Sequence, residues 1–189
     1  DAAAQGSYTV RRGAMSGTYQ SRFVLIGSMN PEEGRLRPQI LDRFGLRVNV
    51  RGLTSRDERL MVYHRVREYR NNPTQFIRQW EAATTTTREE IMLARELLYE
   101  TRLADDAIDL GLQLVQKLEI DSHRAEYTMF EAARAHAAAD GRDIATVSDI
   151  RAVAALALRQ RRSQFMVNFF SSQQEEDQQI YSFIDDMVR

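Results

Sequence analysis

The sequence predicts a mostly α-helical protein with a small α/β part at its N-terminal end. Two observations carry this prediction. Up to residue 53 the chain shows the alternation, apolar runs and glycine turns that are typical of strands. From residue 54 onward, apolar residues recur at the spacing of helices. We therefore expect three parts: residues 1–53, a helical domain at 54–162 and an amphipathic tail at 163–189.

Strand patterns dominate the first part. Residues 7–12 and 18–23 flank the glycines of RRGAMSG, which predicts a hairpin. Residues 23–26 form a continuous apolar run and predict a strand buried on both faces. Residues 46–50 alternate and predict a half-buried strand. The proline- and glycine-containing stretch at 30–45 predicts a loop with one short helix.

Helix signals follow in a regular series. Ser55 is a plausible N-cap, and Pro73 is expected to start the next helix after a stop at Asn71–Asn72. The four threonines at 84–87 predict a polar, β-branched break. Further helices are expected around 91–98, 108–118 and 124–139, and after the capping-box-like residues 146–149.

Composition excludes several classes of function. The chain has 189 residues, no cysteine and a net charge of −1, so disulfides and cysteine-based zinc sites are absent and nucleic-acid binding is not expected. No apolar run approaches the roughly 20 residues of a membrane span, and the N-terminus does not resemble a signal peptide. We therefore expect a cytoplasmic protein. The chain has one lysine, Lys117, and no glycine loop precedes it, so a P-loop is excluded.

Three residues are candidates for chemistry. Asn30 follows the predicted buried strand, where ligands often bind, although an Asn-Pro pair also favours a plain turn. The pair Asp42–Arg43 lies between two apolar residues, and Arg43 suits phosphate recognition, but a local ion pair with Asp42 is the alternative. Arg124 opens a helix, where a cation opposes the helix dipole, so stability does not explain its position.

The remaining candidates favour structural roles. Glu32 and Glu33 are expected to be solvated, and the three histidines show no metal spacing, so no metal site is predicted. The basic stretch at 157–162 ends a helix, where cations favour the dipole. The Phe165–Phe170 cluster is expected to pack or to face a partner.

Residues 22–45, which include FVLIGSMNPEEGRLRPQILDRFG, closely resemble the segment after the Walker B strand in the ATPase subunit (subunit I) of magnesium chelatase. The resemblance continues more weakly to about residue 162, and the wider relatives are AAA+ ATPases of the chelatase and MoxR group. Arg35 stands where that family usually has glutamate. The resemblance implies a C-terminal part of a AAA+ P-loop ATPase core, with a hairpin and two strands, followed by a helical lid.

The resemblance also implies residue roles. Asn30 matches sensor 1, which reads the terminal phosphate and the attacking water. Arg43 matches the arginine finger supplied in trans, and Asp42 would lie at the same subunit interface. Arg124 matches the nucleotide-touching sensor 2 arginine of the lid. Residues 7–21 match a hairpin insertion of the core.

For the complete protein, the resemblance implies an ATP-dependent ring, expected to be hexameric, that uses ATP with Mg²⁺. Its partners would be a D-type subunit with a von Willebrand A domain and a large porphyrin-binding subunit. Together they would insert Mg²⁺ into protoporphyrin IX during (bacterio)chlorophyll synthesis. Because the sequence has no Walker A or Walker B motif, we expect a fragment that does not hydrolyse ATP alone. A MoxR-type chaperone and a non-catalytic helical interaction module are the alternatives.

Overall fold

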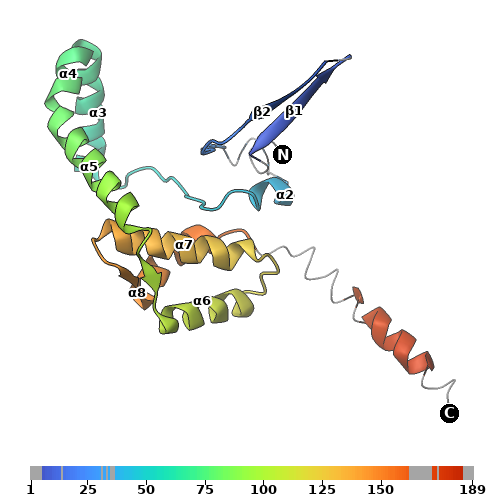
Figure 1. The fold of residues 1–189 in the computed structure, drawn as a ribbon. Helices are drawn as coiled ribbons and strands as arrows, with labels where there is room; N and C mark the ends of the chain where they lie inside the picture. Colours follow the sequence, from blue (N-terminus) through green and yellow to red (C-terminus); the bar gives the residue numbers. More distant parts are fainter. Residues whose placement is uncertain are drawn as a thin grey trace. The chain divides into compact units, whose positions relative to one another are not determined.

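The computed structural model describes residues 6–13, 15–30, 32, 34, 37–161, 172–173 and 175–184. The chain divides into two compact units, residues 1–36 and 37–189, which are described separately here (Figure 1). The functional boundary near Leu53 stays a prediction. Among the described residues, no helix is long and apolar enough to cross a membrane.

The N-terminal unit contains the predicted hairpin. Strand β1 (Ser7–Arg12) pairs antiparallel with β2 (Met15–Gln20), and its ends are matched as Ser7 to Gln20 and Arg12 to Met15. Gly13, in the turn, has a φ of 62°, which glycine adopts without strain. The rings of Tyr8 and Tyr19 stack across the strands with centroids 5.5 Å apart. The hairpin prediction is confirmed, although β2 begins three residues earlier than expected.

The two other strand predictions are wrong. Residues 23–26 and 46–50 are irregular, and Val24 and Ile26 are about nine-tenths exposed. An apolar run of this kind requires a neighbouring strand on each side, and the described residues offer neither segment such a partner. In residues 46–50 the expected alternation of buried apolar and exposed polar residues is also absent, since Arg47 is buried and the two valines are exposed.

The second unit begins with the short helix α2 (Pro38–Leu41), as predicted. Helix α3 (Arg56–Asn71) follows Ser55, with Asp57 and Glu58 in the favourable first turn. Helix α4 (Pro73–Gln79) starts at the predicted proline, and the Asn72 side chain caps it by accepting a hydrogen bond from the Gln75 backbone N–H at 3.1 Å.

The predicted break at residues 84–87 is wrong, because helix α5 (Glu81–Leu97) runs straight through it. The hydroxyl of Thr84 donates to the Trp80 carbonyl at 2.9 Å, and that of Thr86 to the Ala82 carbonyl at 3.2 Å. These back-bonds satisfy the hydroxyls inside the helix. The low helix propensity of threonine, a few tenths of a kcal/mol per residue, is therefore insufficient to interrupt it.

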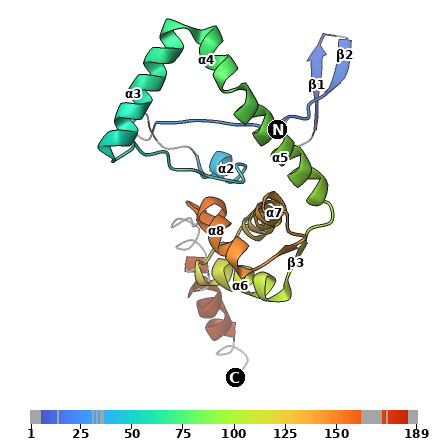
Figure 2. The same cartoon turned by 90° about the vertical axis from the view of Figure 1, so that its left-hand side faces the viewer.

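The core lies among three helices. Helices α6 (Asp105–Lys117), α7 (Arg124–Ala139) and α8 (Val147–Leu158) pack together, and the short parallel pair β3 (Arg102–Leu103) and β4 (Ile144–Ala145) joins their ends (Figure 2). The mostly α-helical prediction is confirmed, but this second sheet was not expected. On α7 the buried side chains are alanines and one methionine, and on α8 most are branched; they include Ala125, Met129, Ala133, Ala137, Ile150, Val153 and Ala157.

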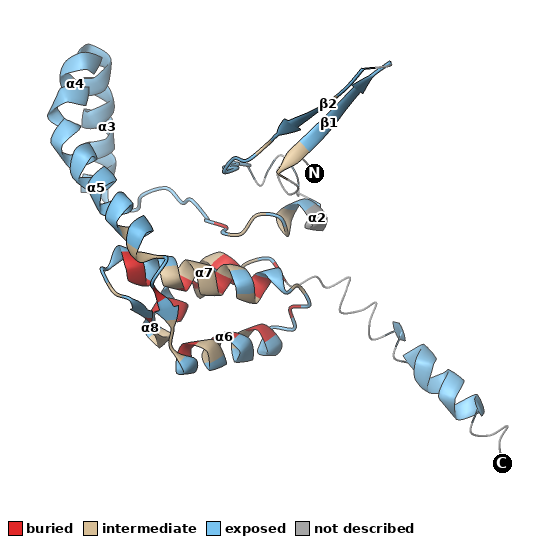
Figure 3. Ribbon diagram, in the orientation of Figure 1, coloured by how far each residue is buried: buried red, intermediate tan, exposed pale blue. Residues whose placement is uncertain are grey.

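Burial is confined to one end of the second unit. Figure 3 shows buried residues in α6, α7 and α8, whereas α3, α4 and α5 contain none.

In the tail, residues 175–184 are helical and exposed, and the Phe165–Phe170 cluster lies outside the described residues.

Candidate functional site

The segment between Leu41 and Arg47 is held against the three-helix core by Arg161, which follows α8. The Arg161 side chain is fully buried. Its Nη1 donates to Asp42 Oδ1 at 2.9 Å, and its Nη2 donates to the carbonyls of Gly45 at 3.0 Å and Phe44 at 3.3 Å. Its Nε donates to the Ala157 carbonyl, which anchors the side chain to α8. Burial lowers the pKa of Arg161, and the Asp42 carboxylate opposes that shift.

Arg47 holds the other end of the same segment. Its guanidinium donates to the carbonyls of Leu41 and Arg159, and its backbone N–H donates to Leu156 at 2.9 Å. Arg159 returns a hydrogen bond to the Arg47 carbonyl at 3.3 Å. Burial is also the main cause that lowers the pKa of Arg47. Residues 41–47 are thus fixed to the C-terminal end of α8 at both ends.

Asp42 connects this segment to the start of α7. Its Oδ1 accepts from Ser122 Oγ at 3.0 Å as well as from Arg161. Its Oδ2 lies 3.9 Å from Nε of Arg124, a longer ion pair between partly exposed groups. Glu126 Oε1 bonds His123 Nδ1 at 2.7 Å, whereas Arg124 pairs with Asp42.

Arg43 and Asn30, two of the predicted site residues, lie in different units of the chain. Arg43 is exposed and sits in the turn after α2, where its backbone N–H donates to Ile40 at 3.1 Å. The structure therefore brings Asp42, Arg43 and Arg124 into one region of the second unit. Asn30 belongs to the first unit, where its Oδ1 accepts from the Glu32 backbone N–H at 3.4 Å, as in a turn.

A second charged cluster lies where α7 ends and α8 begins. Asp149 is fully buried; it accepts two hydrogen bonds from Arg142, one from His136 at 2.7 Å and one from the Thr146 backbone N–H at 2.8 Å. The Arg142 hydrogen bonds hold the pKa of Asp149 well below its usual range. The predicted capping box at 146–149 is confirmed.

The ligand atoms of His136, Asp140 and Asp149 lie within 4.8 Å of one another, close enough to surround a cation. However, the Arg142 guanidinium donates to both carboxylates, at 3.1 Å to Asp140 and more closely to Asp149. A positive charge is therefore already present between them, and the buried Asp149 caps α8.

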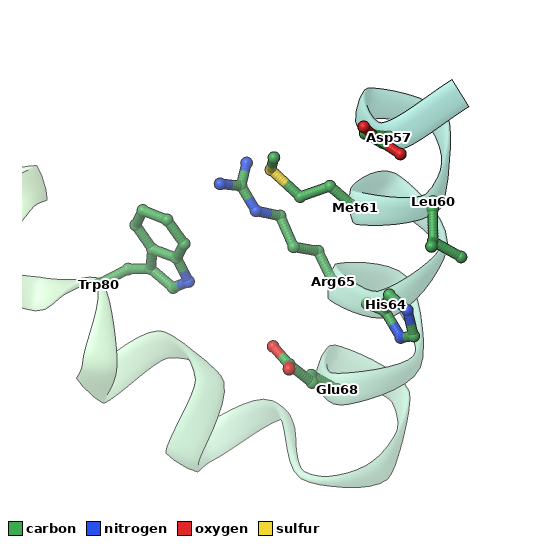
Figure 4. A pocket seen from close by; sticks show the side chains of 7 residues that line it. All are labelled: Asp57, Leu60, Met61, His64, Arg65, Glu68 and Trp80. Atoms are coloured by element: carbon green, nitrogen blue, oxygen red, sulfur yellow. The ribbon is translucent and has the colours of Figure 1, made fainter. Parts of the chain in front are cut away.

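A shallow groove lies between α3 and the start of α5. Its lining residues are Asp57, Leu60, Met61, His64, Arg65, Glu68 and Trp80. Arg65 and Met61 point toward Trp80 (Figure 4), and the Arg65 guanidinium lies 5.0 Å from the centre of the indole. None of the predicted site residues lines this groove.

Sequence reasoning missed Arg161, Arg47 and Ser122. The stretch containing Arg161 was interpreted as a helix end, and Arg47 as part of a strand. No local pattern could have identified them, because the partner of Arg161 lies 119 residues away in the sequence. The one available signal was the density of arginines in a chain with a single lysine.

Comparison with known proteins first defines the class. Residues 111–181 match the AAA lid domain family. The fold is similar to a solved structure from Cytophaga hutchinsonii, named as a candidate ATPase, with a TM-score of 0.55 at 18% identity over 81% of this chain and 50% of that one. Helices α6, α7 and α8 therefore belong to a lid of the AAA+ type.

Within that class the chain is ChlI-like. It is 40% identical over 191 residues to a magnesium-chelatase subunit ChlI homolog of Methanocaldococcus jannaschii, covering 94% of this chain and 52% of the relative. It is 42% identical over 161 residues to the magnesium-chelatase 38 kDa subunit of Acidiphilium rubrum, covering 85% and 47%. The resemblance to chelatase subunit I is confirmed. The chain spans about half the length of these curated relatives.

Proposed function

We propose that this chain is the lid-bearing part of a AAA+ motor subunit of magnesium chelatase. The observation that carries the proposal is the 42% identity to the Acidiphilium rubrum 38 kDa subunit over 161 residues. In the complete protein, ATP hydrolysis would drive Mg²⁺ insertion into protoporphyrin IX for (bacterio)chlorophyll synthesis. The subunits would form a ring in the cytoplasm, with a D-type subunit carrying a von Willebrand A domain and a large porphyrin-binding subunit as partners.

The chain contributes arginines to nucleotide sites in this proposal. ATP, bound with Mg²⁺, supplies the phosphoryl group; the P-loop motif that would bind it is absent from this sequence. Arg43 is the finger that stabilises charge on the transferred phosphoryl group of the neighbouring subunit. Its exposure supports this role, because a group acting on another subunit must protrude.

Arg124 acts as sensor 2 on the nucleotide of its own subunit. Its side chain is 56% exposed, and its 3.9 Å pair with Asp42 is long, so exchanging that partner for a phosphate costs little. Asn30 acts as sensor 1 and orients the attacking water. Asp42 lies at the subunit interface beside Arg43.

The test uses the gene product that contains this chain together with a P-loop. Arg43→Ala should lower kcat for ATP hydrolysis by about 10³-fold or more while ring assembly and helicity persist. Arg124→Ala should weaken ATP binding. The matched control is Arg151→Ala, which removes an exposed arginine of α8. Unchanged turnover in Arg43→Ala would refute the finger assignment and favour a non-catalytic helical module.

A second assay separates chelatase from chaperone. The wild-type ring is mixed with a D-type and a porphyrin-binding subunit, protoporphyrin IX, ATP and Mg²⁺, and metal insertion is followed by porphyrin fluorescence. We expect insertion that depends on ATP and is lost in Arg43→Ala. A ring with normal ATPase activity and no insertion would point to the MoxR-type alternative.

A further inference from the structure

We propose that Arg161 is the positioning residue for the proposed arginine finger, holding the turn that presents Arg43 from the lid side. This inference rests on the proposed function, since it assigns a role through Arg43. It adds a residue that is remote from Arg43 in the sequence.

The first step is the geometry of the turn. Arg161 bonds the residue before Arg43, at Asp42 Oδ1, and the two residues after it, at the carbonyls of Phe44 and Gly45. The Asp42 side chain before Arg43 and the backbone after it are thereby tied to a single planar guanidinium. An arginine can do this because its five N–H donors have a fixed, forked arrangement.

The second step is rigidity. The Arg161 side chain is fully buried and its Nε is bonded to the Ala157 carbonyl of α8, so the guanidinium cannot follow the turn if the turn moves. Space is also limited on the α7 side, where a Cβ built on Gly45 would lie 3.2 Å from Thr128 Cγ2. Displacement of the turn would therefore break several hydrogen bonds at once.

The third step links the two proposed nucleotide contacts. Asp42 accepts from Arg161 on Oδ1 and pairs with Arg124 on Oδ2. The carboxylate next to the proposed finger is thus shared between a fixed arginine and the proposed sensor 2. Arg161 keeps Asp42, and with it Arg43, in position when Arg124 turns to a phosphate.

The experiment compares Arg161→Met with Asp149→Asn in the P-loop-containing gene product. Asp149→Asn is the matched control, because it weakens the pair of a buried carboxylate with Arg142 in the same lid without touching residues 41–47. Steady-state ATPase kinetics give kcat and KM, and hydrogen exchange reports on the amides of Arg43 and Phe44. The Arg43→Ala variant is measured in parallel.

We expect Arg161→Met to lower kcat at least tenfold, with KM for ATP within twofold of wild type, and to speed exchange at Arg43 and Phe44. Asp149→Asn should change neither kcat nor the exchange at Arg43 and Phe44, even if it lowers the melting temperature as much as Arg161→Met does. Equal kcat in the two variants would overturn the positioning role. If Arg161→Met does not fold, Arg161→Lys replaces it. Lysine keeps the ion pair with Asp42 but not both hydrogen bonds to the carbonyls, so kcat should fall three- to tenfold. A wild-type kcat in Arg161→Lys would overturn the positioning role.

The two proposals fail in different ways. Full turnover in Arg43→Ala would refute the arginine finger of the proposed function, and the positioning role with it. Reduced turnover in Arg43→Ala, combined with an Arg161→Met that behaves like Asp149→Asn, would refute only the positioning role.

Discussion

Arg161 Nη1 and Asp42 Oδ1 lie 2.9 Å apart, although 119 residues separate them in the sequence. The arginine side chain is fully buried, whereas the carboxylate is 36% exposed. This pair attaches residues 41–47 to the helical lid. It also brings Arg43 into the same region as Arg124, which reaches the other oxygen of Asp42.

The Asp149 cluster should be a main source of lid stability. Asp149→Ala removes a buried carboxylate that binds Arg142, His136 and the N-terminus of α8. We expect a loss of about 2–3 kcal/mol in the free energy of unfolding, below the figure for a fully buried pair because Arg142 can be solvated. Urea unfolding checks this, with Asp109→Ala on the exposed face of α6 as control. A loss within about 0.5 kcal/mol, as is usual at surface sites, would contradict the assignment.

The same cluster predicts the direction of a pH effect. The pKa of Asp149 is lowered by Arg142, so its carboxylate stabilises the lid above the unfolded-state pKa of about 3.9. That contribution is lost as the pH falls below about 4 toward the folded pKa. His136, Asp140 and Arg142 face the group. Unfolding free energies from pH 6 to pH 3 should fall more steeply in wild type than in Asp149→Asn, and parallel curves would exclude Asp149 as the source.

Gly111 should not tolerate a larger residue. A Cβ added there would lie 2.4 Å from Phe130 Cε1 and 3.0 Å from Met129 Cε, so the Phe130 ring must shift. Overpacking of this kind costs about 1–3 kcal/mol, partly offset by the roughly 1 kcal/mol that alanine gains over glycine within a helix. Gly111→Ala should therefore lower the melting temperature of the lid, while Gly52→Ala, with open space around it, should not. A more stable Gly111→Ala would show that the Phe130 ring moves aside at little cost.

Helix α5 should be continuous through its four threonines. Thr85→Pro should cost about 3 kcal/mol or more, because it removes an interior hydrogen bond and clashes with the preceding turn. Circular dichroism should show a loss of helix, whereas Thr85→Ala should keep or raise the signal. If residues 84–87 formed the break that the sequence suggests, both variants would give the same spectrum.

The sequence alone determined the elements whose signals are local. The hairpin follows from its glycine turn, α4 from Pro73 and the Asn72 cap, and α8 from the capping box at 146–149. These signals act within a few residues and so survive in any tertiary context. The resemblance to chelatase subunit I also lay in the sequence, and comparison with chelatase subunits confirmed it.

Tertiary structure decided what depends on distant partners. The apolar run at 23–26 is not a strand, because the described residues supply no neighbour to pair with it. The helix through the threonines at 84–87 is a different case, because the hydroxyls of Thr84 and Thr86 bond carbonyls only four residues earlier and the contact is local. The contacts of Asp42 with Arg161 and Arg124 depend on the folded chain. A buried guanidinium needs hydrogen-bond acceptors, and these can come from any part of the sequence. Local periodicity does not indicate which distant residues supply them.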